Sequence, residues 1–433
     1  MKALPKRLGP LDGAILIFSN VVGVGIFTTP GIVAGAVPNT WLFLLTWCIG
    51  GLFAFIGASG YARLAATYPK AGGEYIYLKN AFGPLAGYLS GWTSFVAGFS
   101  GAIAASAVGF AIYLKRAIPG LPENLLGLST DSWLAIALIV GVAIVHVLSV
   151  KAGRKLHFWL GGLAILAIMI LVVIGVFSNV SSYSVIEPAP VTGSAFLLAM
   201  VPVLFTFSGW NAAVYISEEI HDPKKNMRYA LLLGTAAVVF VYLLLNMLFV
   251  RVLGVQGMGS SLEVGFDLAA AILGSNGSIF ISIIILLALL SSVSAMIMAG
   301  PRIYFAMARD GLFPRKIQQL HPKFHTPSLA IVAQVAWSIL LVLSGTFEDI
   351  LIYTGFSIIL FSGLSVAVIL VHRDFQTTAR QKLFYGFFVL VSLLILINAI
   401  YSAPRPSLFG AGIILLGIPF YYLFKSQGAK KPM

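Results

Sequence analysis

The sequence predicts an all-α membrane protein with twelve transmembrane helices, of which the first and the sixth are broken. Of its 433 residues, 59% are hydrophobic and only 9% are charged, whereas about 25% of the residues in an ordinary soluble domain are charged. Apolar segments long enough to cross about 30 Å of hydrocarbon recur along the chain. Two of them are interrupted by glycine, which favours non-helical backbone at membrane depth.

Short connections join the apolar segments. The longest one expected outside the bilayer, 115–131, is too short to fold independently, so 1–433 is predicted to form a single domain. The first segment has no small-residue cleavage site after a short apolar core, which favours a retained helix over a signal peptide. The expected spans are 12–36, 41–66, 83–114, 132–150, 156–178, 193–217, 228–253, 274–307, 327–345, 349–371, 383–402 and 408–424.

Basic residues orient these spans. Twelve is an even number, so both termini are expected on one side of the membrane. With the N-terminus in the cytoplasm, only Lys115, Arg116, Arg251 and Arg405 of the 27 Lys and Arg residues lie outside, in agreement with the positive-inside rule. This distribution explains the net charge of +13 without a nucleic acid partner. We expect a multi-pass protein of the cell (inner) membrane with both termini cytoplasmic.

The two predicted breaks are rich in glycine and lie near proline. The first is expected at Gly23 to Phe27, before Pro30, and the second at Phe205 to Asn211, after Pro202. Non-helical backbone survives at membrane depth only inside protein or beside a water-filled cavity. We therefore expect both breaks to border a polar cavity near the bilayer midplane, as in transporters.

Broken helices expose peptide dipoles that can bind opposite charges. The start of each second half-helix offers free N–H groups that suit a carboxylate, and the end of each first half-helix offers carbonyls that suit an ammonium group or a cation. A free α-amino acid carries both charges. The middle of every expected span lacks Asp, Glu, Lys and Arg, and Glu218 and Glu219 lie at the cytoplasmic end of the sixth. This absence disfavours a strongly cationic or dianionic ligand, which would need a buried counter-charge.

Simpler explanations remain open for each feature. Gly23 and Gly25 could serve close helix packing, and the aromatic residues of the second break could face lipid or the protein core. The acidic pair Glu218-Glu219, followed by Asp222 to Lys225, could be a solvated helix end instead of a cytoplasmic gate made of ion pairs.

Ordered motifs run through the chain. They are Gly23 to Phe27, Tyr68 to Tyr75, Phe205 to Asn211 with Glu218 to Asn226, and Pro301 to Gly311 with His321-Pro322 and Thr326-Pro327. With these motifs the chain resembles the amino acid–polyamine–organocation superfamily, and within it the L-type amino acid transporters and their bacterial relatives. The resemblance extends over all twelve segments.

The resemblance implies a leucine-transporter fold of one transporter domain. Inverted repeats would cover 12–182 (helices one to five) and 193–373 (helices six to ten), and the last two helices would lie in 382–425. The substrate carboxylate would meet backbone amides of the first break, and the ammonium would meet carbonyls of both breaks. The implied substrate-binding residues are Ser19, Val22, Gly23, Val24, Gly25, Ile26, Phe205 (an aromatic gate), Thr206 and Ser208, with Trp210 and Asn211 shaping the side-chain subsite.

The chain departs from the family at two places. Val24 stands where relatives often have serine, so backbone amides remain but a hydroxyl contact is lost. Many relatives also have a lysine in segment five, where its ammonium occupies a position like a sodium site; here 160–165 contains no lysine. We hypothesise that a sodium ion replaces this ammonium, although the serines could instead bond their own helix carbonyls. The proposed ligands are Ser19, Val22, Ser291, Ser292 and Ser294.

The sequence thus favours a secondary active transporter of neutral L-amino acids, working by alternating access, with no cofactor except this sodium ion. A sodium-independent exchanger and a proton-coupled permease remain alternatives. An organic-amine or polyamine carrier would need an acidic residue facing the cavity, and none is apparent. An amino acid sensor or a membrane enzyme on a transporter scaffold is a different class. We expect no catalytic residues, because His146, His157 and His372 lie near span ends and not together.

The expected partners are the amino acid and the lipid bilayer. The lone Cys48 excludes an intrachain disulfide and a cysteine metal cluster. Animal relatives use a cysteine in the loop between helices three and four to join a heavy chain, and this loop has none. We therefore expect no disulfide-linked heavy chain.

Overall fold

The computed structural model describes residues 6, 8–23, 25–118, 120–178, 180, 190–259, 261, 263–274, 277–344, 347–402 and 404–429 of the chain. Val24 and the predicted end of the first repeat at residue 182 lie outside these residues. The elements up to residue 177 are α1 (Pro10–Val21), α2 (Gly25–Ala36), α3 (Thr40–Thr67), α4 (Glu74–Phe82), α5 (Pro84–Thr93), the π-helix η1 (Ser94–Gly98), α6 (Phe99–Ala117), β1 (Asn124–Leu125), β2 (Leu128–Ser129), α7 (Thr130–Leu148) and α8 (Val150–Phe177).

The rest of the described chain is also helical. Its elements are α9 (Gly193–Thr206), the 3₁₀ helix η2 (Ala212–Glu219), α10 (Pro223–Gly259), α11 (Val264–Leu273), α12 (Gly277–Ala299), α13 (Pro301–Arg309), the 3₁₀ helix η4 (Arg315–Gln318), α14 (Ser328–Ser344), α15 (Phe347–Val371), α16 (Ala379–Ser402) and α17 (Pro404–Ala429).

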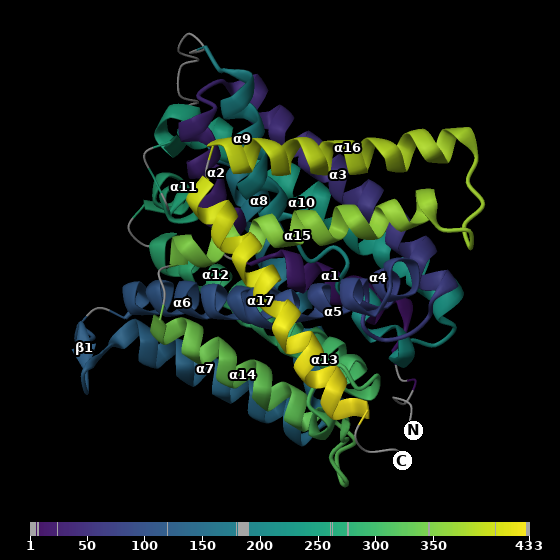
Figure 1. Cartoon of the computed structure of the whole chain (residues 1–433). Helices are drawn as coiled ribbons and strands as arrows, with labels where there is room; N and C mark the ends of the chain where they lie inside the picture. The colour runs from purple at the N-terminus through teal and green to yellow at the C-terminus, as the bar shows by residue number, and fades with distance from the viewer. Residues whose placement is uncertain are drawn as a thin grey trace.

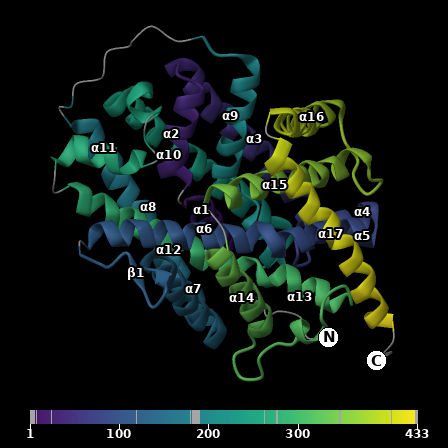
Figure 2. The ribbon, with the colours of Figure 1, turned by 60° about the vertical axis from the view of Figure 1, so that its left-hand side comes forward.

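The helices surround the two broken ones. Figure 1 shows α6 through the middle of the molecule, with α15 and α16 to one side and α7 and α14 to the other. Helix α17 crosses α15 and α5 on the outside. The interior holds α1 and α2 (Figure 2); α1 packs against α8, α10 and α12, and α2 packs against α9 and α10.

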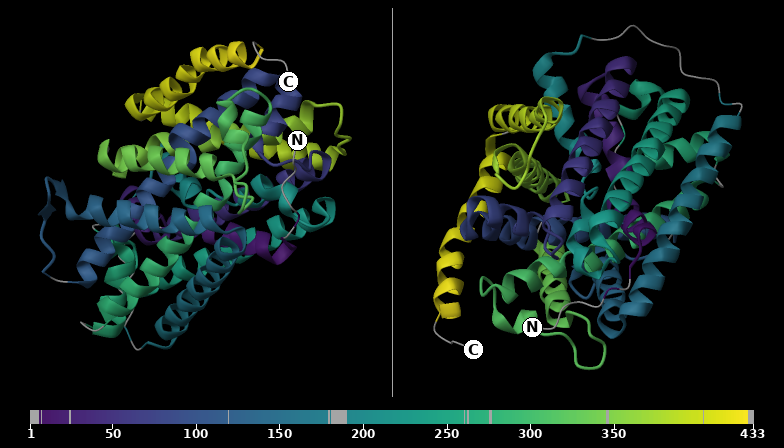
Figure 3. Two further views of the ribbon diagram at one scale, coloured as in Figure 1. Left: turned by 90° about the horizontal axis from the view of Figure 1, so that it is seen from below. Right: turned by 90° about the vertical axis from the view of Figure 1, so that its right-hand side faces the viewer.

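The outer helices present apolar side chains that face away from the protein. Helix α8 lies along one edge of the molecule (Figure 3). Its exposed apolar residues recur every three or four positions, which places them on one face of the helix. This face suits contact with lipid chains. It consists of Trp159, Leu163, Leu166, Ile170, Val173 and Phe177.

The structure confirms a nearly all-helical, multi-pass architecture. Among the described residues, eight helices are long and apolar enough to cross a membrane, and the bent pair α1–α2 is a ninth candidate. The remaining three predicted spans fall on shorter apolar helices, namely Gly193–Thr206, Ser328–Ser344 and Gly355–Val371. Each predicted segment therefore coincides with helix, while the count of twelve spans stays a prediction.

The first break lies where the sequence predicts it. Helix α1 ends at Val21, and α2 starts at Gly25 with its axis bent by 47°. Beyond the break, Pro30 lies inside α2. The chain before α1 pairs with the end of η2, because the Leu8 N–H donates to the Glu219 carbonyl at 2.9 Å and the His221 N–H donates to the Leu8 carbonyl at 2.9 Å.

The second break is also glycine-centred. Helix α9 ends at Thr206, the chain turns through 207–211, and it continues as the tighter helix η2. Gly209 adopts a φ of +103°, which a helix cannot contain and which residues with a Cβ rarely adopt. Pro202 lies inside α9. Proline removes one hydrogen bond from a buried helix, whereas a positive φ ends it, so Gly209 and not Pro202 sets the second break. At the first break the chain instead leaves the helix at Val22, which has an extended φ of −76° and ψ of 94°.

Several short elements were not predicted from the sequence. The loop after α3 contains α4, and the chain after α10 contains α11. Between α6 and α7, β1 and β2 form a two-stranded antiparallel hairpin. Helix α4 buries most of its first half, so its stability comes from contacts with distant segments that a local apolar pattern does not reveal.

Candidate functional site

Both breaks border one cavity. Its volume is about 100 Å³, which exceeds the roughly 10–15 Å³ that one water molecule requires and suits a small solute. The first broken helix contributes Asn20, and the second break contributes Ser208, Gly209 and Asn211. Other lining residues come from the loop before α4, from α4 itself, and from α5, η1, α6, η2, α12, α13 and α15. They are Gly72, Glu74, Tyr75, Ser90, Thr93, Ser94, Gly98, Phe99, Ala102, Tyr215, Met296, Ile303, Ser357, Ile358 and Phe361.

The breaks are packed directly against each other. A Cβ on Gly25 would lie 3.0 Å from the Thr206 hydroxyl oxygen and 3.3 Å from the Thr206 Cα, and a Cβ on Gly209 would lie 2.3 Å from the Asn20 amide nitrogen. The N-terminal end of α2 thus meets the C-terminal end of α9, which pairs opposite ends of two helix dipoles. Glycine is required at both positions because the backbones approach so closely.

One tyrosine binds both breaks. The buried Tyr242 hydroxyl of α10 lies 2.8 Å from the Val21 carbonyl and 3.2 Å from the Thr206 carbonyl. These carbonyls lose their helical partners at the two breaks. The single proton of the Tyr242 hydroxyl is shared between them, and the shorter distance is to the Val21 carbonyl. The Thr206 carbonyl, which the family resemblance assigned to the substrate ammonium, is therefore shared with Tyr242.

An unsatisfied acceptor remains at the cavity. The side-chain oxygen of Asn20 is shielded from solvent and has no hydrogen-bond partner among the described residues. Buried acceptors without partners are rare and call for a ligand, water or ion. Sequence reasoning did not select Asn20, although an asparagine within an otherwise apolar half-helix was a visible signal.

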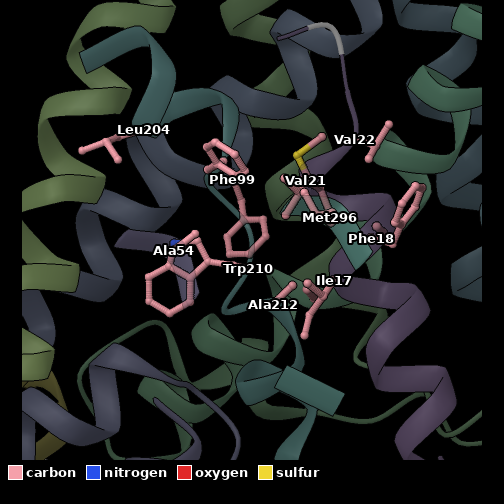
Figure 4. Packing of buried hydrophobic residues seen from close by; sticks show 14 of the residues in the cluster. Ile17, Phe18, Val21, Val22, Ala54, Phe99, Leu204, Trp210, Ala212 and Met296 are labelled. Atoms are coloured by element: carbon pink, nitrogen blue, oxygen red, sulfur yellow. The ribbon is translucent and has the colours of Figure 1, made fainter. Parts of the chain in front are cut away.

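The predicted substrate residues divide into two groups. Ser208 and Asn211 line the cavity, whereas Trp210 packs its ring against Tyr61 with centroids 4.8 Å apart. Figure 4 shows Trp210 to one side of the buried cluster and Phe18 and Val22 of α1 to the other. The rest lie at the breaks without lining the cavity, and Val24 is outside the described residues. They are Ser19, Val22, Gly23, Gly25, Ile26, Phe205 and Thr206.

An acidic side chain faces the cavity, so the expectation that none would do so is wrong. Glu74 lines it and is only 8% exposed. Its Oε1 accepts hydrogen bonds from the Tyr61 hydroxyl at 2.9 Å and from the Asn211 amide. The sequence places Glu74 in a polar connection after the second span, but this connection folds back beneath the breaks as α4.

Burial perturbs this carboxyl. Removal from water raises the pKa of Glu74, and hydrogen bonds from Tyr215, Tyr61 and Asn211 oppose that rise. The Asn211 amide nitrogen also donates to the Tyr215 hydroxyl oxygen at 2.9 Å. The second break is thereby tied to α3 and α4 through one carboxylate.

The predicted cation ligands do not all converge. The hydroxyl oxygens of Ser19 and Ser291 would lie 2.5 and 3.7 Å from a Cβ on Gly161 of α8, and both are buried without a partner among the described residues. Ser292 points at the first break, 3.2 Å from a Cβ position on Gly23. Ser294 instead contacts the His146 Nε2 of α7 at 2.9 Å. Ser291 and Ser294 belong to the same helix, α12, but Ser294 contacts α7 whereas Ser291 lies near Ser19, so a shared role for the two serines stays a prediction.

Packing around Gly161 is tight, because a Cβ there would lie 2.5 Å from the Ser19 hydroxyl oxygen and 2.7 Å from Cγ2 of Ile15. Two orphaned hydroxyls lie near this position of α8, and a cation bound by them stays a prediction. Within the described part of the chain, no group of three His, Cys, Asp or Glu residues could hold a metal ion. Neutral oxygen donors suit hard cations such as sodium, which lack the affinity of transition metals for nitrogen and sulfur.

Ion pairs close the end of η2. Glu219 and Arg302 of α13 form a pair at 2.9 Å whose side chains are only 3% and 5% exposed, and Glu218 pairs with Arg309 at 2.7 Å. The interpretation of a fully solvated helix end is therefore wrong for Glu219. Its ion pair holds η2 against α13, whereas a role of these pairs as a gate stays a prediction.

Comparison with known proteins finds similar sequences over almost the whole chain. A family model described as "Amino acid permease" matches residues 8–424. The human large neutral amino acids transporter small subunit 2 is 28% identical, over 97% of this chain and 81% of its own. The cystine/glutamate transporter of Pongo abelii is 26% identical, over 97% and 85%. The Asc-type amino acid transporter 1 of Mus musculus is 26% identical, over 97% and 81%.

Proposed function

Because the chain belongs to the amino acid permease family, we propose that it is a secondary active transporter of neutral L-amino acids that works by alternating access. The family and its relatives are transporters, so the chain is not a membrane enzyme. The observation that carries the proposal is the shared cavity, in which Asn20 of the first broken helix and Ser208 and Gly209 of the second break meet.

Recognition of the zwitterion would use the two breaks. The substrate carboxylate would bind at the N-terminal end of α2, near the amides of Gly25 and Ile26, where the helix dipole favours negative charge. The substrate ammonium would donate to the free side-chain oxygen of Asn20 and to carbonyls such as those of Val22 and Phe205. Because Gly25, Ile26, Val22 and Phe205 do not line the cavity in this structure, such binding would require the two breaks to separate. Ser208 would contact either group from the opposite wall.

The cavity disfavours dianionic substrates. Among the described residues, its lining contains no Lys or Arg, although a dianionic substrate would need such a counter-charge. One relative is named for large neutral amino acids and another for cystine and glutamate. The lining of this chain suits the first substrate class better than the second.

Sodium coupling is a second part of the proposal. Ser19, Ser291, Ser292 and the Val22 carbonyl would hold the ion, and Ser294 is removed from the set because His146 takes its hydroxyl. A bound sodium ion would supply the positive charge that lysine provides in many relatives. Sodium-independent exchange and proton coupling are the alternatives. The support for sodium is the pair of orphaned hydroxyls near Gly161.

The test is uptake of radiolabelled L-leucine and L-alanine into proteoliposomes. Gly25→Leu should abolish uptake, because its side chain would enter the space of Thr206. Gly412→Leu is the matched control, since nothing lies within 4 Å of a Cβ there. Uptake by Gly25→Leu at the rate of the control would contradict the proposed site.

Sodium coupling has its own measurement. Thermal shifts of the purified protein are compared in sodium and potassium chloride, for wild type and for Ser291→Ala. A stabilisation specific to sodium that disappears in Ser291→Ala is expected, and Ser344→Ala, at an exposed position on α14, is the control. Equal shifts in both salts would remove sodium from the proposal.

The location and partners complete the proposal. We place the protein in the cell membrane with both termini cytoplasmic, and without a disulfide-linked heavy chain. In a Cys48→Ala background, the variant Glu123→Cys, in the α6–α7 connection, should react with an impermeant maleimide on intact cells. The variant Gln318→Cys should react only after the cells are permeabilised. The reverse pattern would invert the topology.

A further inference from the structure

The proposed recognition of the zwitterion does not use Glu74. This carboxyl starts α4, lines the cavity, and is 8% exposed. Among the described residues, no Lys, Arg or His forms an ion pair with it. The basic residues nearest this end of the cavity are paired elsewhere, Lys79 with Asp310, Arg302 with Glu219 and Arg309 with Glu218.

An ionised carboxylate in such a place is unfavourable. Transfer of a charge out of water requires a counter-charge or several hydrogen bonds, and otherwise the group takes up a proton. Glu74 receives hydrogen bonds from Tyr61 and Asn211 but no counter-ion. Burial accordingly raises the pKa of this carboxyl above its ordinary value.

Within the described part of the chain, the titratable groups that interact with Glu74 most strongly are tyrosines. Tyr61 faces it from α3, Tyr215 from η2, and Tyr77 from within α4. An ordinary tyrosine ionises only near pH 10, so these side chains stay neutral in the range where a carboxyl titrates. Glu74 is therefore the group in this cluster whose charge changes at moderate pH.

Glu74 is connected to the second break through Asn211. The Asn211 amide donates to Glu74 and to Tyr215, and the same residue lines the cavity beside Ser208 and Gly209. A hydrogen bond to a carboxylate is about twice as strong as one to a neutral acceptor. The charge on Glu74 thus determines how firmly Asn211 is held away from a solute in the cavity.

We propose that Glu74 is a proton-binding site coupled to the amino acid cavity, so that a proton on Glu74 strengthens amino acid binding. The inference rests on the proposed function. The proton arrives from water in the cavity and forms an O–H bond on the carboxylate. Neutral Glu74 holds Asn211 less tightly, and the Asn211 amide then turns to the substrate. By thermodynamic reciprocity, bound amino acid strengthens proton binding to the same extent.

The first measurement detects the proton without any substrate. Infrared spectra of the purified protein are recorded between about pH 4 and 8, across and above the ordinary range of a carboxyl. A C=O band of a protonated carboxyl should persist above that range in wild type. It should be missing in Glu74→Gln and retained in Glu123→Gln, whose exposed carboxylate pairs with Lys115 in the α6–α7 connection. The same band in Glu74→Gln would overturn the assignment.

The second measurement detects the coupling. The affinity for L-leucine is measured by thermal shift at about pH 4 and 8, the two ends of the range used for the infrared spectra. Wild type and Glu123→Gln should bind at least about fivefold more tightly at the lower pH, the lower limit of typical coupling. Glu74→Gln should bind equally at both. A wild-type pH profile in Glu74→Gln would overturn the coupling and leave the proposed function intact.

L-Lysine distinguishes a proton site from a subsite for cationic side chains. Stabilisation by L-lysine that is stronger than that by L-leucine and is lost in Glu74→Gln would overturn the proposal, because Glu74 would then bind the substrate directly. If none of the amino acids stabilises any variant at either pH, the proposed function fails and the coupling fails with it. The infrared band still decides whether Glu74 holds the proton.

Discussion

Single side chains decide what the two breaks can bind. Within the described lining of the cavity, the side-chain oxygen of Asn20 is a buried acceptor without a partner, and Glu74 is an acid. The single proton of the Tyr242 hydroxyl is shared between the carbonyls of Val21 and Thr206. Some backbone groups that lose their helical hydrogen bonds at the breaks are therefore bound by side chains of the protein, and the others remain for the substrate. Individual residues such as Tyr242 decide which groups remain.

Gly209 is the residue at which the smallest change should matter most. Its φ of +103° and the Asn20 amide at 2.3 Å from a Cβ position both exclude a side chain. We expect Gly209→Ala to lower the free energy of unfolding by roughly 1–2 kcal/mol or more and to weaken L-leucine binding. Thermal denaturation and thermal-shift titration measure the two effects. Gly412→Ala, in open space on α17, should be neutral or stabilising, and equal effects at both positions would contradict this explanation.

Glu74 should also make stability depend on pH. Burial raises its pKa in the folded state, so the folded protein binds the proton more tightly than the unfolded chain does. Its stability should then be highest below the ordinary carboxyl pKa of about 4.3 and fall as the pH rises through the folded-state value. The apparent melting temperatures of wild type and Glu74→Gln should coincide at low pH, where Glu74 is protonated. At neutral pH the melting temperature of Glu74→Gln should be the higher of the two. A difference independent of pH would refute the assignment.

At the level of elements, the sequence predicted the positions of the two helix breaks better than it predicted the side chains and the short helix that line the cavity beside them. Glycine clusters are local signals, so both breaks lie where the sequence predicts them. The backbone conformation after Gly209 decides which side chains face the cavity. Asn211 lines the cavity, whereas its neighbour Trp210 packs on Tyr61. The position of Glu74 depends on how α4 folds beneath the breaks, and no local pattern contains that information.

The short helix η2 is held at its end by two ion pairs of different burial. Glu219–Arg302 is almost inaccessible, whereas the side chains of Glu218 and Arg309 are 13% and 19% exposed. Removing one partner of a buried pair typically destabilises by about 3–5 kcal/mol, and an exposed pair contributes about 1 kcal/mol or less. We therefore expect Glu219→Gln to lower the apparent melting temperature much more than Glu218→Gln does.

The double variant Glu219→Leu/Arg302→Met tests whether the unpaired charge causes this loss. It should recover much of the stability lost in Glu219→Gln, because no charge is then left buried. If the double variant is less stable than the single one, the hydrogen bond from Arg302 to the Met298 carbonyl contributes more than the ion pair does.

At the level of the whole molecule, the cavity extends from the breaks toward α4 and η2. In the proposed topology, which follows the positive-inside pattern, these elements lie at the cytoplasmic end of the bundle. The same end carries the contacts that hold α1, namely the Leu8 pairing with η2 and the ion pair of Asp12 with Arg154 of α8 at 2.8 Å. Alternating access requires a broken helix to tilt against the scaffold, so these contacts should influence how often the cavity opens to the cytoplasm.

The rate at which a cysteine in the cavity is labelled measures how often the cavity opens. In the Cys48→Ala background, Ser208→Cys should react with an impermeant maleimide faster in inside-out vesicles than in right-side-out vesicles, because the described lining reaches the cytoplasmic end. Asp12→Asn removes one contact that holds α1 and should increase the rate from the cytoplasmic side. The substitution Glu123→Gln removes an ion pair at the opposite end of the protein and should leave the labelling rate from the cytoplasmic side unchanged. Labelling only from the outer side would mean that the cavity opens in the opposite direction, and an unchanged rate in Asp12→Asn would mean that α1 does not move to open it.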